Sequence, residues 1–195
     1  EIETILPKPK KRFSIYGNDG SRNKLNKLKE IIQYCSVNKI NLIMIIPPRH
    51  IALTEMERLL TENNYFNDWK IELSRLVNNF KQNLPEGIKL QLWDFALIND
   101  YTSEKVSEPG ENMKWFRDRI HFKDNLGNHV LDIVFDNDNG GNISPSNFGV
   151  AMDYLNIVDH LDNSERISQE FRSTNKMYLE NLGSNVQSAL NSYIR

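Results

Sequence analysis

The sequence predicts an α/β fold with a parallel β-sheet, followed by a C-terminal helical tail. An alternating run over 12–16 precedes helical periodicity over 23–38, and an almost continuous apolar run over 40–46 comes next. Strand, helix and buried strand in this order are typical of a right-handed βαβ unit. A further helical stretch that leads into an apolar run at 88–95 repeats the pattern.

The first unit is predicted from three local signals. Arg12–Tyr16 alternates as a strand does, and the glycine-rich stretch Gly17–Gly20 is typical of a turn. The next segment has apolar residues at helical spacing, namely Leu25, Leu28, Ile31, Ile32 and Cys35. The run Ile40–Ile46 is rich in β-branched residues and ends at Pro47 and Pro48, which predicts a central strand buried on both faces.

The rest of the chain continues this alternation and then becomes helical. Periodicity predicts helices over 52–60, 65–80 and 126–135, and a strand over 88–95. Polar segments predict loops over 99–113 and 136–147, and long loops in compact domains are often functional. Residues 148–195 have a helical pattern that is only weakly apolar after Asp162. We therefore expect an α/β domain over 1–160 and a helical tail over 161–195, which could pack on a partner.

Composition limits the classes of function. The chain has 195 residues, of which 39% are hydrophobic, so it can form one substantial core. Its 24 basic and 26 acidic side chains are spread along the sequence, which argues against nucleic acid as the main partner. The longest apolar run, Leu42–Pro48, is too short to cross a bilayer, and the lone Cys35 is expected to be a core residue.

The stretch Asp118-Arg119-Ile120-His121 is the strongest candidate for chemistry. A carboxylate three residues before an imidazole can accept a hydrogen bond from one ring nitrogen and leave the other free to take a proton from a nucleophile. Arg49, His50 and Asp94 follow predicted strands, so they are expected at the same carboxyl edge of the sheet, where ligands bind in open α/β folds. They are our candidate substrate-binding residues. Simpler interpretations stay open for each group, namely a solvated strand end, a turn cap or a surface ion pair.

No metal or cofactor site is predicted. The segment Asp136–Gly140 lacks the acids that an EF-hand calcium loop needs in register. His121 and His129 are eight residues apart, which is not a regular spacing for zinc ligands. A glycine-rich phosphate loop between a strand and a helix is also missing, so a flavodoxin-like nucleotide binder is only a third interpretation.

The residues also carry a resemblance. The chain resembles the C-terminal half of bacterial SGNH/GDSL hydrolases, in particular those associated with acyl transfer in the cell envelope, as in alginate acetylation and teichoic acid alanylation. The resemblance runs from about residue 12 to about residue 172. It rests on Asn41–His50, Trp69, Leu92–Phe95, Trp115, Asp118-x-x-His121-Phe122, Gly127, Phe148–Val150 and His160-Leu161.

This resemblance implies a flavodoxin-like three-layer domain with a Ser–His–Asp site. His121 would be the general base, Asp118 would orient it, and a serine on an early strand-to-helix turn would attack an ester carbonyl. The sequence departs from the family at this serine, because no Gly-Asp-Ser block follows an early strand. Ser21 is the nearest candidate in the chain. Since the chain opens on Glu1 rather than Met, we expect the nucleophile on sequence upstream of it or on another polypeptide.

Two hypotheses follow. The first is an SGNH-like esterase or O-acyltransferase acting on ester-linked acyl groups of an envelope or extracellular glycan, without a cofactor. It would lie in the periplasm, the envelope or outside the cell, although the sequence does not exclude the cytoplasm, and its partner would be a membrane-bound acyltransferase or an N-terminal fragment. The second is a non-catalytic α/β subunit of a larger envelope assembly.

Overall fold

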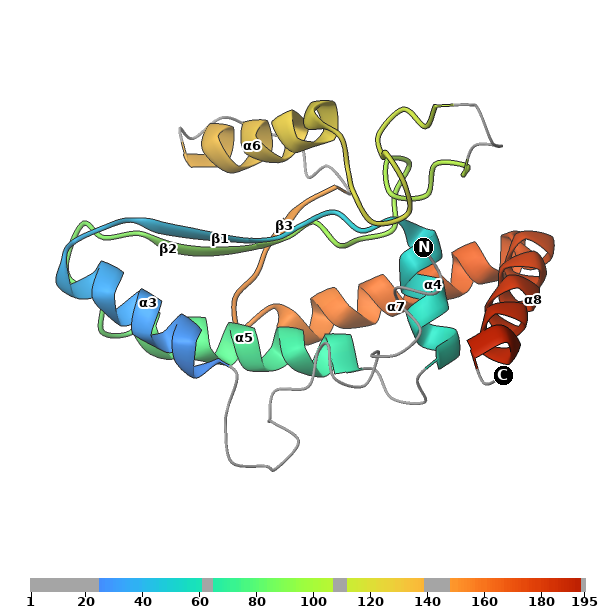
Figure 1. Ribbon diagram of the computed structural model, residues 1–195. Helices are drawn as coiled ribbons and strands as arrows, with labels where there is room; N and C mark the ends of the chain where they lie inside the picture. The colour runs from blue at the N-terminus through green and yellow to red at the C-terminus, as the bar shows by residue number, and fades with distance from the viewer. Residues whose placement is uncertain (1–24, 61–64, 107–111, 139–147, 194–195) are drawn as a thin grey trace.

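A computed structural model describes residues 25–60, 65–106, 112–138 and 148–193 (Figure 1). Over these residues the helices are α3 (Asn26–Val37), α4 (Ile51–Leu60), α5 (Tyr65–Lys81), α6 (Asp124–Asp138), α7 (Ile157–Thr174) and α8 (Lys176–Tyr193). The strands are β1 (Leu42–Ile46), β2 (Leu90–Asp94) and β3 (Val150–Ala151). The chain is therefore an α/β protein, as predicted.

The described strands form one mixed sheet in the order β1-β2-β3. β1 and β2 are parallel, with a register that runs from Leu42 opposite Leu90 to Ile46 opposite Asp94. β3 is antiparallel to β2, so the expectation of a purely parallel sheet is wrong at this strand. The predicted helix from residue 148 onward is also wrong at its start, where Val150 and Ala151 form β3. The sequence did not indicate this strand, since two residues are too few to show an alternating pattern. A Cβ at Gly149 would overlap the ring of Phe95, so glycine allows β3 to approach β2.

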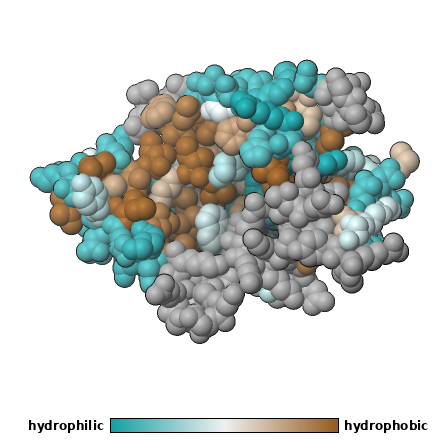
Figure 2. Space-filling view, in the orientation of Figure 1, coloured by the Kyte–Doolittle hydropathy of each residue, from teal (hydrophilic) through white to brown (hydrophobic). Residues whose placement is uncertain are grey.

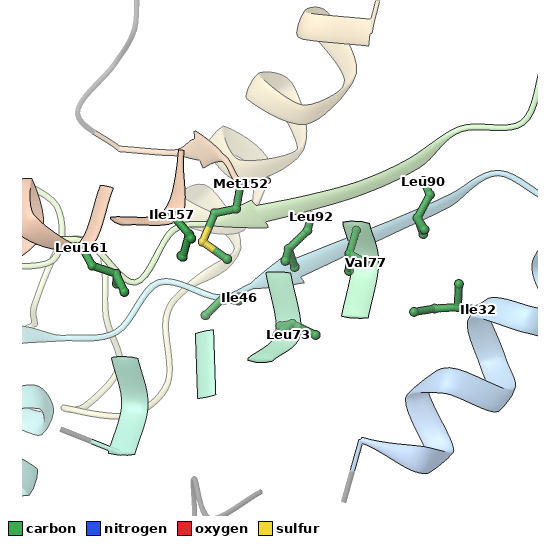
Figure 3. Packing of buried hydrophobic residues seen from close by; sticks show 9 residues of the cluster. All are labelled: Ile32, Ile46, Leu73, Val77, Leu90, Leu92, Met152, Ile157 and Leu161. Carbon is green, nitrogen blue, oxygen red and sulfur yellow. The ribbon is translucent and has the colours of Figure 1, made fainter. Parts of the chain in front are cut away.

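Helices cover both faces of the sheet. Figure 1 shows α6 on one face and α3, α5 and α7 on the other. Figure 3 shows the core on the second face, where aliphatic side chains from β1, β2 and the three helices meet. Its buried members are Ile32, Ile46, Leu73, Val77, Leu90, Leu92, Met152, Ile157 and Leu161.

A second core lies between the sheet and α6. It is more aromatic and includes Trp93, Phe95, Phe116 and Phe148 together with apolar residues of α6. Ile43 and Ile45 of β1 pack against this core, whereas Leu42 and Met44 pack against the first one. β1 is thus apolar on both faces, which is why its sequence is a continuous apolar run rather than an alternating one.

The last two helices pack on the α/β part in different ways. The first turns of α7 contribute Ile157 and Leu161 to the core of the sheet. α8 packs on α4 through a small cluster of Leu53, Met56, Leu182 and Val186. In the described part of the chain, no helix is long and apolar enough to cross a membrane.

The predicted helices at 23–38, 52–60, 65–80 and 126–135 are confirmed, with ends that differ by up to about three residues. The predicted strand at 12–16, Ser21 and most of the predicted loop at 136–147 lie outside the described residues.

Candidate active site

Asp118 and His121 form the pair that their spacing predicts. Oδ2 of Asp118 lies 2.7 Å from Nδ1 of His121, and the side chains are 26% and 68% exposed. The other oxygen, Oδ1, accepts the backbone N–H groups of Ile120 at 2.6 Å and His121 at 2.7 Å. With Nδ1 donating to the carboxylate, Nε2 carries the lone pair of the neutral ring, so it can accept a proton.

The carboxylate of this pair favours its charged form. Partial burial raises the pKa of Asp118, but the hydrogen bonds from the His121 ring and from the two backbone N–H groups outweigh it and lower the pKa below its usual value. Asp118 is therefore ionised at neutral pH and can stabilise an imidazolium as it forms on His121.

A tight hairpin holds this pair in place. Phe116 and Phe122 form an antiparallel bridge, and Arg117 N–H donates to the carbonyl of His121 at 2.7 Å. At the tip, Ile120 packs against the cluster that joins α4 to α8. The pair is thus fixed both by its own backbone and by two helices beneath it.

Glu104 anchors the hairpin at its base, and sequence reasoning missed it. Its carboxylate accepts the backbone N–H groups of three consecutive residues, Lys114 at 2.8 Å, Trp115 at 2.9 Å and Phe116 at 2.7 Å. Glu104 lies in the polar segment 99–113, which we predicted to be a long loop. A single acid in such a segment has no pattern that distinguishes it from a solvated one.

His50 connects this loop to the end of β1. Its side chain is fully buried, its Nδ1 accepts the Ala52 N–H at 3.1 Å, and its Nε2 lies 2.8 Å from the carbonyl oxygen of Glu104. The first contact makes Nδ1 an acceptor, so Nε2 carries the proton and donates it to this carbonyl. The ring also packs edge-to-face on Phe116 at 5.2 Å. His50 therefore supports the hairpin from below, at the carboxyl end of β1.

Asp94 lies in a separate, buried ionic cluster. It is fully buried, and its Oδ2 contacts Lys70 Nζ at 2.5 Å and His160 Nε2 at 2.8 Å. Its Oδ1 accepts the Ala96 N–H at 2.9 Å. Burial raises the pKa of Asp94, but the charge of Lys70 and the hydrogen bonds from both partners outweigh it and lower the pKa. Burial in turn lowers the pKa of Lys70, an effect that Asp94 partly opposes.

Arg49 lies near this cluster, because its guanidinium and the Lys70 ammonium contact the same aromatic ring. Its guanidinium contacts Glu57 at 2.6 Å and lies 4.6 Å from the centre of the Phe66 ring, and Lys70 contacts the same ring at 4.4 Å. The structure thus joins Asp118 with His121 and supports them through His50. It places Asp94 in the buried ionic cluster and leaves Arg49 partly buried, on the Phe66 ring that Lys70 also contacts. Lys70 and His160, the partners of Asp94, come from helices whose periodicity gives no sign of buried charge.

Comparisons with known proteins do not identify a family. No family model, no curated protein and no solved structure matches this chain. Among the described residues, no group of three or more histidine, cysteine, aspartate and glutamate side chains is placed to hold a metal ion.

Proposed function

We propose that this chain carries the histidine and aspartate of an SGNH-like esterase or O-acyltransferase, on a flavodoxin-like three-layer scaffold. The observation that carries the proposal is the 2.7 Å contact from Nδ1 of His121 to Oδ2 of Asp118, with the histidine exposed and the aspartate held by two backbone N–H groups. This is the arrangement that a Ser–His–Asp mechanism requires of its base and its orienting acid.

The chemistry follows from the free ring nitrogen. Nε2 of His121 would take the proton of a serine hydroxyl as its oxygen attacks an ester carbonyl, and it would return that proton to the leaving alcohol. The resulting acyl-enzyme is resolved by water in an esterase and by a sugar hydroxyl in an acyltransferase. The proposed substrates are ester-linked acyl groups of an envelope or extracellular glycan.

The buried residues have supporting roles in this proposal. His50 and Asp94 were candidate substrate-binding residues, but a fully buried side chain whose polar atoms already have partners is better suited to holding the scaffold. We propose that His50 positions the hairpin and that Asp94 joins α5 and α7 to the end of β2. Arg49, whose exposure is low, is proposed to stabilise the start of α4 through Glu57.

A fluorophosphonate probe tests the proposal on the native protein in its natural context, because the probe labels only an activated serine. We expect labelling that falls about a hundredfold or more in His121→Ala and in Asp118→Asn, as for loss of a general base or its orienting acid. His129→Ala is the matched control, because His129 is also exposed and follows in the next helix. Mass spectrometry of the labelled peptide identifies the serine. An unlabelled native protein would contradict the proposal.

The second candidate is a non-catalytic subunit, and one observation favours it. Apolar side chains of α3 and α6 are exposed, including Ile31, Tyr34, Leu131 and Phe135. Contiguous exposed apolar surface is typical of sites that bind other polypeptide segments. The same probe distinguishes the two candidates, since a subunit without catalysis stays unlabelled while it keeps its partners.

A further inference from the structure

We propose that the outer face of the hairpin 115–123 is a sugar-binding surface, where the Trp115 ring stacks on a pyranose ring and the Arg117 guanidinium binds its oxygen atoms. The choice of a glycan as ligand rests on the proposed function, whereas the surface itself follows from the geometry of the hairpin. His50 and Asp94, which the sequence predicted to bind substrate, are fully buried. A substrate of His121 therefore has to be bound by other side chains.

The hairpin has an inner and an outer face. Phe116 and Phe122 form its antiparallel bridge. Phe116 is fully buried and Phe122 packs against the aromatic core, so the side chains of this pair point inward. Because successive side chains of a strand point to opposite faces, the residues next to each phenylalanine point outward. These residues are Trp115, Arg117, His121 and Lys123.

Two of the outward residues are close neighbours of His121. Arg117 N–H donates to the His121 carbonyl at 2.7 Å, so the two residues are directly opposite, a position in which Cβ atoms are about 4.5–5.5 Å apart. Lys123 N–H donates to the Trp115 carbonyl at 2.8 Å. Trp115 is therefore diagonal to His121, at about 7–8 Å. A sugar whose ester lies at Nε2 of His121 is thus within reach of both side chains.

The Trp115 ring is held in place and reaches the surface. It is partly buried, with its centre 4.7 Å from that of the Tyr101 ring and 5.5 Å from that of the His129 ring. The ammonium of Lys114, an exposed side chain, lies 4.4 Å from the centre of the Trp115 ring. The ring is therefore accessible from the side of this flexible cation, which can move away when a ligand binds. A ring that its neighbours already hold loses little conformational entropy on binding.

Arg117 is an exposed hydrogen-bond donor. Its side chain is 65% exposed, and its ion pair with Asp124 is long, at 3.4 Å, with an aspartate that is 93% exposed. Such a surface pair contributes little to stability, so a ligand can replace it. A guanidinium has five N–H donors in a fixed plane, which suit the hydroxyl and carboxylate oxygens of a sugar.

The outer face suits a sugar because it combines a ring with a donor. One side of a pyranose ring carries C–H groups, which pack on the negative face of an indole, and its rim carries oxygens that accept hydrogen bonds. Figure 2 shows hydrophobic surface over β1, between α6 and α3, whereas the surface at the start of α6, which follows the hairpin, is hydrophilic. The outer face is thus separate from the apolar surface that favours a polypeptide partner.

NMR titration of the whole chain with neutral cellotetraose and acidic tetragalacturonate tests the surface. Every pyranose has C–H groups to stack, so we expect at least one of these oligosaccharides to bind. The indole N–H peak of Trp115 and the ring C–H peaks of His121 should then shift together. Trp93 and His50 are buried and serve as internal controls whose peaks should not move. Sorbitol, which has hydroxyl groups but no ring, should shift none of these peaks.

Variants assign the binding to the two side chains. Trp115→Ala should weaken binding about tenfold or more, and Trp115→Phe, which keeps a ring, should retain much of it. Arg117→Gln should weaken binding about two- to tenfold through the lost hydrogen bonds. Arg75→Gln is the matched control and should bind as the wild type does. Arg75 is also a half-exposed arginine in an ion pair near an aromatic ring, but it lies on α5, on the opposite face of the sheet (Figure 1).

Several outcomes would overturn this assignment. Neither oligosaccharide shifting Trp115, or Trp115 shifting without His121, would mean that no sugar binds beside the candidate base. Binding that survives both Trp115→Ala and Arg117→Gln would place the sugar elsewhere, and a shift of Trp115 with uridine monophosphate alone would assign the ring to nucleotides. Binding requires no serine, so the two proposals fail separately. An unlabelled protein that binds the sugar loses only the esterase, and a labelled protein that does not bind it loses only this surface.

Discussion

Two aspartate–histidine pairs in this molecule have nearly the same length and opposite surroundings. Asp118 contacts His121 at 2.7 Å, and Asp94 contacts His160 at 2.8 Å. The first pair is exposed at the tip of a hairpin, and its histidine is 68% exposed. The second is buried, and its histidine is only 6% exposed. The hydrogen bond alone therefore does not define a catalytic pair.

The difference between the pairs lies in what each ring can still do. His121 donates from Nδ1 and keeps Nε2 at the surface, where a reactant can reach it. His160 uses Nε2 for Asp94, which also binds Lys70, so that carboxylate already has two charged or polar partners. A buried carboxylate whose oxygens already accept hydrogen bonds contributes to stability. An exposed ring nitrogen with a lone pair can instead take up a proton during catalysis.

Asp94→Asn should have the largest effect on stability. The change removes the negative charge opposite Lys70 and leaves a buried ammonium without its counter-ion, which costs about 3–5 kcal/mol of unfolding free energy. Urea unfolding measures this loss. A variant that also changes Lys70 to Met should recover much of the stability, because it removes the unpaired charge. A loss below about 1 kcal/mol in Asp94→Asn would show that the cluster is not a buried ion pair.

The same carboxylate should make stability depend on pH in acid. Because the folded pKa of Asp94 is lowered, the unfolded state takes up a proton at a higher pH than the folded state does. The stabilisation is complete above the ordinary aspartate pKa, about 3.9, and is lost as the pH falls through the lowered folded value. Urea midpoints of the wild type and Asp94→Asn should therefore converge as the pH decreases from neutral. A difference that stays constant in acid would contradict this account.

Glu104→Gln should have an intermediate effect. The carboxylate accepts three backbone N–H groups, and a glutamine has one oxygen with which to replace two. We expect a loss of about 1–3 kcal/mol, and also weaker fluorophosphonate labelling because the hairpin carries Asp118 and His121. Glu57→Gln is a matched control that weakens a different ion pair, with Arg49. If the hairpin does not depend on Glu104, labelling will be the same in both variants.

The sequence predicted those features that a short local pattern can encode. The runs that became β1 and β2, the main helices and the Asp118–His121 pairing all depend on neighbours within a few residues. The buried cluster could not be predicted, because Lys70, Asp94 and His160 come from three elements and only their packing makes them partners. Asp94 was expected at an accessible edge, since the sequence does not show that α7 covers the end of β2.

Asp118→Asn should have the smallest effect on stability and so completes the comparison with Asp94→Asn. The substituted amide oxygen can still accept the N–H groups of Ile120 and His121, so the hairpin keeps its backbone bonds. Only the charge opposite an exposed imidazole is lost, and such surface pairs contribute less than about 1 kcal/mol. Urea unfolding should therefore place this variant close to the wild type. Aspartate-to-asparagine substitution would then reduce stability at Asp94 and reactivity at Asp118. This is the expected result if burial determines the role of the first pair and the free ring nitrogen that of the second. A loss at Asp118→Asn as large as that at Asp94→Asn would instead make both pairs structural.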